Sequence, residues 1–384
     1  MKTRTRFFAL LCLGTLFQAC RVDMGPAGPN ASRTVAADVM ADGPQWGPWS
    51  MPINLGPLVN SPLDDNRPAI SKDGLSLYIT SGRPGGFGGL DIWVSQRASV
   101  DDPWGPPQNL GPTVNSSVND VAPAFSPDGH RMYFHSFRPG ECGLADIYVS
   151  RRRDTRDDFG WGPPEDLGCV VNTPYVNAGP TIFEDETAGT TTLYFTVQNN
   201  PPGSDQGFDI YASTRIGDEG AFGPPILVSE LSSPFRDTRT TIRRDGLEMI
   251  LSSGRPGGVG SEDLWVSTRA STLDPWSTPA NLGAVVNTTA FDGGPALSFD
   301  GTTLYFHSNR PGGVGGNDLY VTTRARLRGQ DVAEDAGVEK QGKEKTHARD
   351  ETHKKRIAAA GRGSRRRYAP GHPAVSRPPG ARRV

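Results

Sequence analysis

Residues 77–95 read LYITSGRPGGFGGLDIWVS, and this stretch decides the fold. An apolar run of β-branched and aromatic residues leads into a glycine-rich turn, and a second such run leads out of it. The pattern predicts a β-hairpin. It recurs in residues 133–150, 249–267 and 304–322, and a more divergent copy occupies residues 193–213. The chain is therefore built from repeats.

Each hairpin belongs to a longer repeat of four predicted strands. Strand A is short, as in residues 122–126, and an Asp-Gly turn follows it, with glycine where a positive φ is needed. The hairpin supplies strands B and C, and a W-x-x-P-x-N-L-G segment such as residues 104–111 supplies strand D. The hairpin aspartates are spaced by 55, 63, 54 and 55 residues: Asp91, Asp146, Asp209, Asp263 and Asp318. This period is typical of a propeller blade.

The order of the strands predicts how the ring closes. The first strand D precedes the first strand A, and no strand D follows the last hairpin, so the N-terminal strand is expected to complete the last blade and leave no open sheet edge. We predict an all-β, five-bladed β-propeller of four-stranded blades. The expected blades are residues 66–115, 121–172, 177–231, 238–287, and 293–324 plus 48–56.

The motifs resemble the PD40 (WD40-like) repeats of TolB-type β-propellers. The resemblance is carried by Ser126-Pro127-Asp128-Gly129, by the Leu-Tyr-Phe strands and by the Arg-Pro-Gly-Gly hairpin loops, and it covers residues 46–324. It implies the fold and says little about function. TolB itself resembles a six-bladed propeller with a separate N-terminal domain, whereas this sequence has five repeats and no such domain, so its role is not carried over.

The N-terminus has the pattern of an export signal. A basic start, with Lys2, Arg4 and Arg6, precedes an apolar run that is too short to span a bilayer and that ends at Cys20. Residues 16–20 resemble the lipobox of bacterial lipoproteins, which implies lipidation of Cys20; an ordinary cleaved signal is the alternative. We expect residues 1–20 to be a signal peptide and 21–45 a disordered tether, with the protein in the periplasm or at the outer membrane surface.

The C-terminal residues have a different composition from the repeats. Residues 325–384 carry 16 Lys and Arg against 7 Asp and Glu, which predicts a basic disordered tail. Export places Cys142 and Cys169 in an oxidising compartment, where they are expected to form a disulfide; two unpaired thiols are the alternative. Export also argues against nucleic acid as the partner of the tail.

Two sets of repeated polar residues are candidates for a site. The hairpin pairs Arg83 and Asp91, Arg138 and Asp146, Arg255 and Asp263, and Arg310 and Asp318 are predicted to hold the glycine turns, since groups present in nearly every blade are typical of scaffold. Just before strand A, five residues share one register: Asp65, Asp120, Asn177, Asp237 and Asp292. We expect them to ring the channel mouth, where they could bind Ca²⁺, a basic peptide or a sugar; capping of their own loops is the alternative. No other metal or cofactor is expected.

No catalytic residue is assigned from the sequence. His135 and His307 occupy the same strand B position and are expected to be polar packing groups, and Trp49, Trp104, Trp161 and Trp276 are expected to pack between blades. A glycosidase needs an acid and a base in different environments, yet the four ring aspartates are equivalent by repeat. An enzyme should break the repeat symmetry at a few channel-facing acids.

These observations favour a binding function. We expect a non-enzymatic, monomeric binding or scaffold propeller of the bacterial cell envelope, anchored to the membrane by lipid, that docks a protein or a peptidoglycan or polysaccharide component at its channel face. The alternatives are a carbohydrate-binding or glycoside-hydrolase-like five-bladed propeller and a mainly structural envelope protein. The divergent third blade is a further candidate recognition edge.

Overall fold

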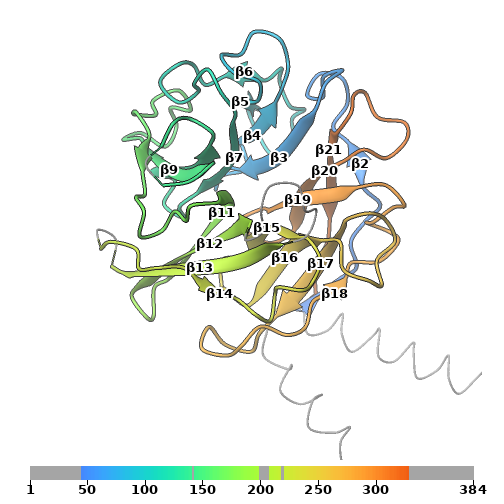
Figure 1. The fold of residues 1–384 in the computed structure, drawn as a ribbon. Helices are drawn as coiled ribbons and strands as arrows, with labels where there is room; N and C mark the ends of the chain where they lie inside the picture. The colour runs from blue at the N-terminus through green and yellow to red at the C-terminus, as the bar shows by residue number, and fades with distance from the viewer. Residues whose placement is uncertain (1–44, 141, 199–206, 218–219, 328–384) are drawn as a thin grey trace, which may run out of the picture. The chain divides into compact units, whose positions relative to one another are not determined.

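A computed structural model describes residues 45–140, 142–198, 207–217 and 220–327. In these residues five four-stranded antiparallel sheets form a ring, which confirms the predicted five-bladed β-propeller (Figure 1). The expected signal peptide, the expected tether apart from Gln45, and the expected basic tail beyond Leu327 lie outside the described residues. Within the described part of the chain, no helix is long and apolar enough to cross a membrane.

The strands of each blade follow one another along the chain. Blade 1 contains β3 (Asp65–Ile70), β4 (Ser76–Ser81), β5 (Asp91–Gln96) and β6 (Gln108–Asn109). Blade 2 contains β7 (Asp120–Phe125), β8 (Arg131–Ser136), β9 (Asp146–Arg151) and β10 (Glu165–Asp166). Blade 3 contains β11 (Val176–Asp185), β12 (Thr190–Gln198), β13 (Phe208–Ile216) and β14 (Ile226–Leu227). Blade 4 contains β15 (Asp237–Ile242), β16 (Glu248–Ser253), β17 (Asp263–Thr268) and β18 (Ala280–Asn281).

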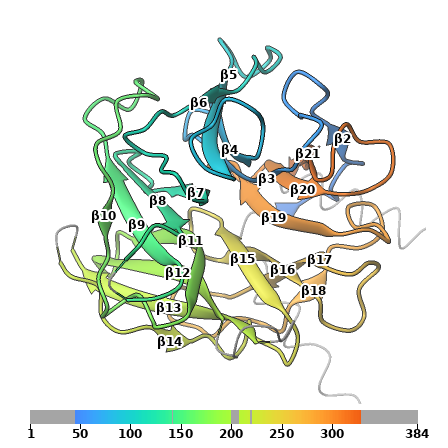
Figure 2. The ribbon, with the colours of Figure 1, turned by 45° about the horizontal axis from the view of Figure 1, so that its top comes forward.

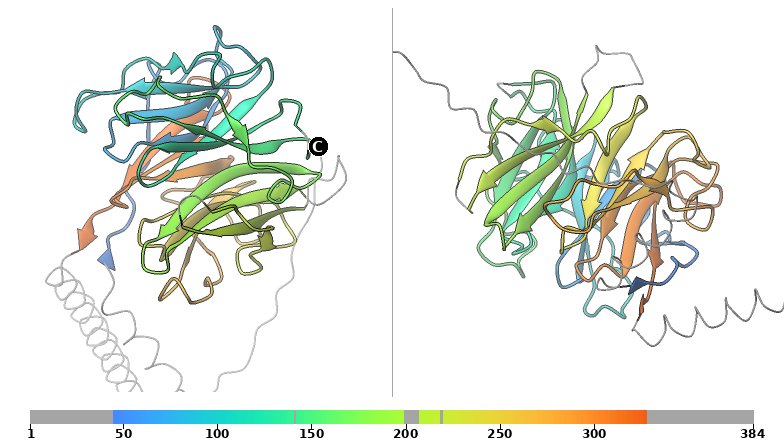
Figure 3. Two further views of the ribbon diagram at one scale, coloured as in Figure 1. Left: turned by 90° about the vertical axis from the view of Figure 1, so that its left-hand side faces the viewer. Right: turned by 90° about the horizontal axis from the view of Figure 1, so that it is seen from below.

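The last blade closes the ring with a strand from the start of the propeller. Blade 5 contains β19 (Asp292–Leu297), β20 (Thr303–Ser308) and β21 (Asp318–Thr323), and its fourth strand is β2 (Ile53–Asn54). The register sets Ile53 opposite Val321, as the strand order predicts. A second pairing lies beyond the predicted end of the propeller at residue 324, where β1 (Gln45–Trp46) pairs with β22 (Arg326–Leu327) (Figure 3).

The innermost strand of every blade lines the channel. β3, β7, β11, β15 and β19 contact one another in sequence around the ring, and β19 returns to β3 (Figure 2). Each of these strands leads into an A–B turn. The Asp-Gly turns carry the predicted positive φ, for example 74° at Gly74 and 77° at Gly301.

The hydrophobic core lies between blades, in five clusters, one at each interface. Between blades 1 and 2, Trp161 packs edge-on against Tyr78, and the guanidinium of Arg152 lies 4.4 Å above the Trp161 ring. The other blades repeat this stack as Arg97 on Trp104, Arg215 on Phe222, Arg269 on Trp276 and Arg324 on Trp49. The strand D tryptophans therefore pack between blades, as expected, and each stack is worth about 0.5–2 kcal/mol.

The glycine-rich hairpin loops are held by their aspartates. Asp91 accepts the backbone N–H groups of Phe87 and Gly88, and it also binds the Asn109 side chain of the neighbouring strand D. A Cβ on Gly88 would lie 2.0 Å from the Val118 carbonyl oxygen, so the loop needs glycine to lie against the next D–A loop. The glycines therefore serve loop packing.

A disulfide joins Cys142 of the blade 2 hairpin loop to Cys169 beyond strand D of the same blade, with Cα atoms 5.2 Å apart. This distance lies inside the normal range for disulfides. The structure thus brings together the two cysteines that the sequence leaves for pairing.

Candidate functional site

The five residues of the expected ring are buried inside the blades. Asp65 is fully buried, and its carboxylate accepts the Ser61 N–H and contacts Arg83 Nη2 at 2.6 Å. Asp120, Asp237 and Asp292 are equally buried and make the same contacts with the start of their own D–A loops and with Arg138, Arg255 and Arg310. Their geometry is that of loop caps, the alternative that the sequence left open.

The hairpin arginines therefore have a different partner from the one expected. The sequence pairs Arg83 with Asp91, and likewise in blades 2, 4 and 5, but the structure pairs each arginine with the ring aspartate 18 residues earlier. The hairpin aspartate instead holds the glycine loop. In blade 3 the ring position is Asn177, whose amide donates to the Ala145 carbonyl at 3.1 Å. An uncharged side chain suits a repeat that lacks the arginine.

The ring carboxylates do not point toward one another in the described structure, so they form no Ca²⁺ site. Among the described residues, one group of three possible metal ligands comes together: Cys142, Asp146 and Asp166. The Cys142 sulfur of this group is already in the disulfide. The ring carboxylates are each neutralised by an arginine of their own blade. A hard cation would have to displace those arginines.

A second register, two residues after the ring, lies on the innermost strands. Its members all have a positive φ: Arg67 (48°), Ala122 (61°), Gly179 (58°), Arg239 (25°) and Gly294 (60°). The β3–β4 register shifts at this point, and the same shift occurs in every blade. Such a bulge turns the backbone N–H away from its own sheet.

Each of these N–H groups binds a side chain of the preceding blade. Ala122 N donates to Thr80 Oγ1 at 2.9 Å, and Gly179 N donates to His135 Nδ1 at 3.3 Å. The remaining acceptors are Thr196, Ser252 and His307. The polar strand B position thus joins blades through five equivalent hydrogen bonds. His135 and His307 have the packing role that the sequence suggested.

Both histidines are neutral acceptors. His135 is 3% exposed and His307 is 7% exposed. Burial, and then the charges of Arg67 and Arg239, hold the pKa of each imidazole well below 6.5. A protonated ring could not accept at Nδ1, so the hydrogen-bond geometry agrees with the direction of the shift.

Arg239 projects into the channel from blade 4. Its Nη2 donates to the Pro68 and Pro123 carbonyl oxygens of blades 1 and 2, at 3.0 Å each. The side chain is buried, and Nε and Nη1 have no hydrogen-bond partner among the described residues. Burial and the charge of Arg67 lower the pKa of Arg239 to about 9. This is an unpaired buried cation in the centre of the ring.

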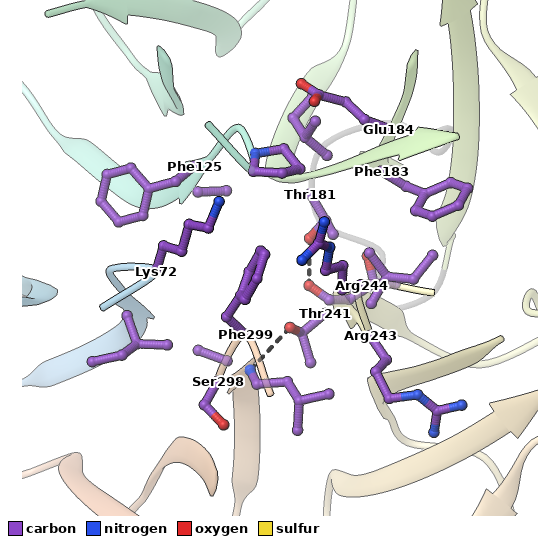
Figure 4. A pocket seen from close by; sticks show the side chains of 18 of the residues that line it. Lys72, Phe125, Thr181, Phe183, Glu184, Thr241, Arg243, Arg244, Ser298 and Phe299 are labelled. Carbon is purple, nitrogen blue, oxygen red and sulfur yellow. Dashed lines mark hydrogen bonds between the residues drawn. The ribbon is translucent and has the colours of Figure 1, made fainter. Parts of the chain in front are cut away.

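A cavity of about 700 Å³ opens where the A–B turns meet (Figure 4). Arg239 is among the residues that line it. Phe299 stands in its mouth between two cations, with Lys72 Nζ 4.7 Å and Arg244 Cζ 4.6 Å from the ring centroid. Phe125, Thr241 and Ser298 also line the wall. The sequence placed the binding face at the other end of the channel, on the D–A and B–C loops.

Five carboxylates line this cavity, and two of them, Asp185 and Asp300, are held in the ionised form; the others are Glu184, Glu186 and Asp245. A hydrogen bond from Thr272 and the N–H of Ala188 lower the pKa of Asp185. Burial raises the pKa of Asp300, but hydrogen bonds from Ser298 and Thr302 outweigh it and leave the pKa lowered. Neither group is suited to donate a proton near neutral pH.

The channel end on the D–A and B–C side holds a glutamate that sequence reasoning passed over. Glu262 is 6% exposed, and burial raises the pKa of its carboxyl although Arg236 Nε lies 2.7 Å away. Both Glu262 and Asp64 raise the pKa of Arg67, so both carboxylates lie near that guanidinium. The other blades have Leu90, Ala145, Phe208 and Asn317 at the Glu262 position. This break in repeat symmetry was the available signal.

Comparison with known proteins gives a likeness of fold. No family model matches the chain. No curated protein matches it either. Among solved structures, the chain resembles the xylan β-1,4-xylosidase of Bacillus halodurans at 15% identity and a TM-score of 0.50, over 70% of this chain and 54% of that one. It also resembles an α-L-arabinofuranosidase of Lactobacillus brevis (16%, TM-score 0.48, 72% and 94%) and TolB of Acinetobacter baumannii (17%, TM-score 0.40, 69% and 56%).

These matches correct the expected function. Arabinofuranosidases, a xylosidase and other glycoside hydrolases are prominent among the matching structures. The expectation of a non-enzymatic envelope scaffold as the leading function is therefore wrong, and the carbohydrate-directed alternative is left as a proposal. At these identities the likeness itself extends to the five-bladed fold and no further.

Proposed function

We propose that this protein is a carbohydrate-binding five-bladed propeller whose ligand, a short saccharide, enters the cavity at the A–B turns. The observation that carries the proposal is the composition of that cavity: aromatic rings, hydroxyls, cations and carboxylates line about 700 Å³ at the channel end. Saccharides present C–H faces that pack on aromatic rings and hydroxyls that need hydrogen bonds. Arabinofuranosidases and xylosidases with the same architecture give the first saccharides to test.

The mouth of the cavity offers both kinds of contact. Phe299 presents an aromatic ring, and Lys72 and Arg244, which flank it, carry hydrogen-bond donors (Figure 4). Thr241 Oγ1 accepts the Leu297 N–H and retains its own hydroxyl proton for a ligand. A saccharide seated here would replace one cation on the Phe299 ring.

Phe299→Ala is expected to weaken saccharide binding by about tenfold or more, because an anchoring aromatic ring commonly contributes over 1.4 kcal/mol. Isothermal titration of the propeller with arabino- and xylo-oligosaccharides measures it. The matched control is Phe159→Ala, which removes a 44% exposed aromatic ring from the outer loop of blade 2. Absence of binding of every oligosaccharide to the folded wild-type protein would overturn the proposal.

Glycoside hydrolysis is a second candidate function, favoured by Glu262. Its pKa is raised by burial, which is the property of a general acid, and Asp64 is a second carboxylate beside Arg67. This pair lies on the D–A and B–C side of the channel and breaks the repeat symmetry, as the sequence argument required of an enzyme. A polysaccharide that entered from this side would meet both carboxylates.

Glu262→Gln is expected to reduce the release of reducing sugar from arabinan or xylan by about 10²–10⁴-fold, since it removes the transferable proton. The control is Glu230→Gln, at an exposed position on the rim of blade 3. Because the pKa of Glu262 is raised, wild-type activity should persist above the usual range of a glutamic acid and fall as that carboxyl ionises. A folded wild-type protein that releases no reducing sugar removes this candidate.

We further propose that the protein is an exported, monomeric propeller of the PD40 type, anchored by lipid at Cys20, that meets cell-wall polysaccharide outside the cytoplasm. The export pattern of residues 1–20 and the repeated Asp-Gly turns and Arg-Pro-Gly-Gly loops support this. Mass spectrometry of the mature N-terminus tests the lipid on Cys20.

A further inference from the structure

The C-terminal strand β22 leaves the propeller beside the cavity. It pairs with β1, and the Trp46 ring of β1 lies against the A–B turn of blade 5, where a Cβ on Gly301 would be 3.3 Å from it. Arg324, just before β22, donates from Nε to the Gly301 carbonyl oxygen at 2.9 Å. Trp46 and Arg326 both line the cavity. The segment that follows Leu327 therefore starts at the cavity wall.

The propeller and the segment that follows it carry opposite charge. Residues 45–327 contain 20 Lys and Arg against 32 Asp and Glu, whereas residues 328–384 contain 15 Lys and Arg against 7 Asp and Glu. Four of these arginines fall within residues 362–367, which read RGSRRR and are called the basic segment below. Opposite charges of this size attract each other, most strongly at low ionic strength.

Carboxylates surround the cavity at the A–B turns and at the end of β11. They are Asp73, Asp128, Glu184, Asp185, Glu186, Asp245 and Asp300. The cavity lining itself has five cations and five carboxylates, but Arg239 and Arg243 are buried, and Arg326 belongs to the C-terminal strand. The exposed cations that the turns contribute are Lys72 and Arg244. At the surface of the lining, carboxylates therefore outnumber the cations of the turns.

Two of these carboxylates are available to a cationic partner. Among the described residues, neither Asp185 nor Asp300 has an ion-pair partner within 4.0 Å. Asp185 accepts the N–H of Thr187, and Asp300 accepts that of Thr302, so both are held in place by their own turns. Hydrogen bonds of this kind leave further lone pairs of a carboxylate free to accept from a guanidinium.

We propose that the basic segment of this chain docks on the carboxylates at the A–B turns and covers the mouth of the cavity. About 35 residues separate Leu327 from Arg362, and an extended chain of that length spans up to about 120 Å, so the segment can reach this surface. Because both partners belong to one chain, the contact forms at a high effective concentration. A docked segment would exclude other molecules from the cavity.

The test measures binding of a fluorescein-labelled peptide of residues 361–368 to the full-length protein, by fluorescence anisotropy at low salt. A tail variant removes the four arginines of the basic segment and should leave the docking surface open. Its substitutions are Arg362→Gln, Arg365→Gln, Arg366→Gln and Arg367→Gln. The peptide should bind the tail variant at least about tenfold more tightly than the wild type, whose own segment occupies the surface.

A second set of substitutions, made in the tail variant, locates the docking surface. Neutralising the three carboxylates of blade 3 should weaken peptide binding by about tenfold or more, and Asn at position 185 keeps the acceptor that holds the turn. These substitutions are Glu184→Gln, Asp185→Asn and Glu186→Gln. The matched control neutralises three exposed carboxylates outside the A–B turns and should leave binding unchanged: Asp101→Asn, Asp102→Asn and Glu230→Gln.

The other outcomes contradict the inference. Equal binding of the peptide to wild type and tail variant would mean that the surface is open in the full chain and takes a basic segment of another molecule. Binding that survives loss of the blade 3 carboxylates, or that falls equally in the control, would mean that the attraction is not local to the A–B turns. Absence of binding to the tail variant would also overturn the contact. No saccharide enters the test, so its result is independent of the proposed function.

Discussion

Replacing Asp237 by alanine is expected to lower the free energy of unfolding by about 3–5 kcal/mol. Its fully buried carboxylate accepts the Ser233 N–H and hydroxyl and the Ser253 hydroxyl, and it pairs with Arg255 Nη2 at 2.6 Å. Alanine would leave the Arg255 cation buried at 10% side-chain exposure without its counter-ion. Chemical denaturation of wild type and variant measures the difference.

Two variants show whether the effect belongs to this buried site. Asp237→Asn keeps the hydrogen-bond acceptor and copies the Asn177 of blade 3, so it should cost less than alanine. Asp101→Ala removes an exposed carboxylate and should leave stability unchanged. If Asp237→Ala unfolds like wild type but loses ligand, the aspartate is a ring residue of the channel, as the sequence first suggested, and the capping role fails.

Acidification from pH 7 to pH 5 is expected to destabilise the propeller through His135 and His307, by at most about 4 kcal/mol for the two together. Each imidazole is buried, and its pKa in the folded state lies well below 6.5. The unfolded chain therefore binds the extra protons as the pH falls below 6.5, and stability is lost toward acid. One proton per histidine limits this loss to about 1.4 kcal/mol per pH unit for each of them.

The variants that isolate this effect are taken from the other blades. Thr80 and Ser252 accept the same interblade N–H without titrating. The double variant His135→Thr with His307→Ser should flatten the loss of stability between pH 7 and pH 5. The packing lost with the two buried rings should lower stability equally at both pH values. An unchanged pH dependence in that variant would show that the histidines are not the groups that bind the protons.

Repetition made the fold predictable from the sequence. The Asp-Gly turn before strand B occurs in four blades, so the assignment of a turn in one repeat is supported by the other three. The position of Asn54 ahead of the first repeat predicted the closing strand. The same reliance on repeated features passes over residues that differ from one repeat to the next. Arg67 and Arg239 stand in a register otherwise filled by alanine and glycine, two residues beyond the aspartates of the expected ring.

The aspartates were misplaced because sequence gives the register of a side chain but not its direction. Asp65 does stand at the entrance of strand A, yet its carboxylate turns into the blade toward Arg83, which lies 18 residues further along. The hairpin loop brings that arginine back over the start of strand A, and no local rule relates the two positions. Glu262 shows the converse, since a difference from the repeat was visible but its burial was not.

The strand that completes blade 5 is expected to pair late in folding. Each hairpin joins residues that are close in the chain, whereas β2 meets β21 at a sequence separation of 264 at the Asn54–Asp318 contact. Bringing such distant segments together costs about 5 kcal/mol of chain entropy, and the contacts of two short strands return it only when the other blades are already in place. The pairing of β2 with β21 should therefore form last in folding and open first in unfolding. A folding intermediate that lacks this pairing should have four complete blades and an unpaired edge on β21.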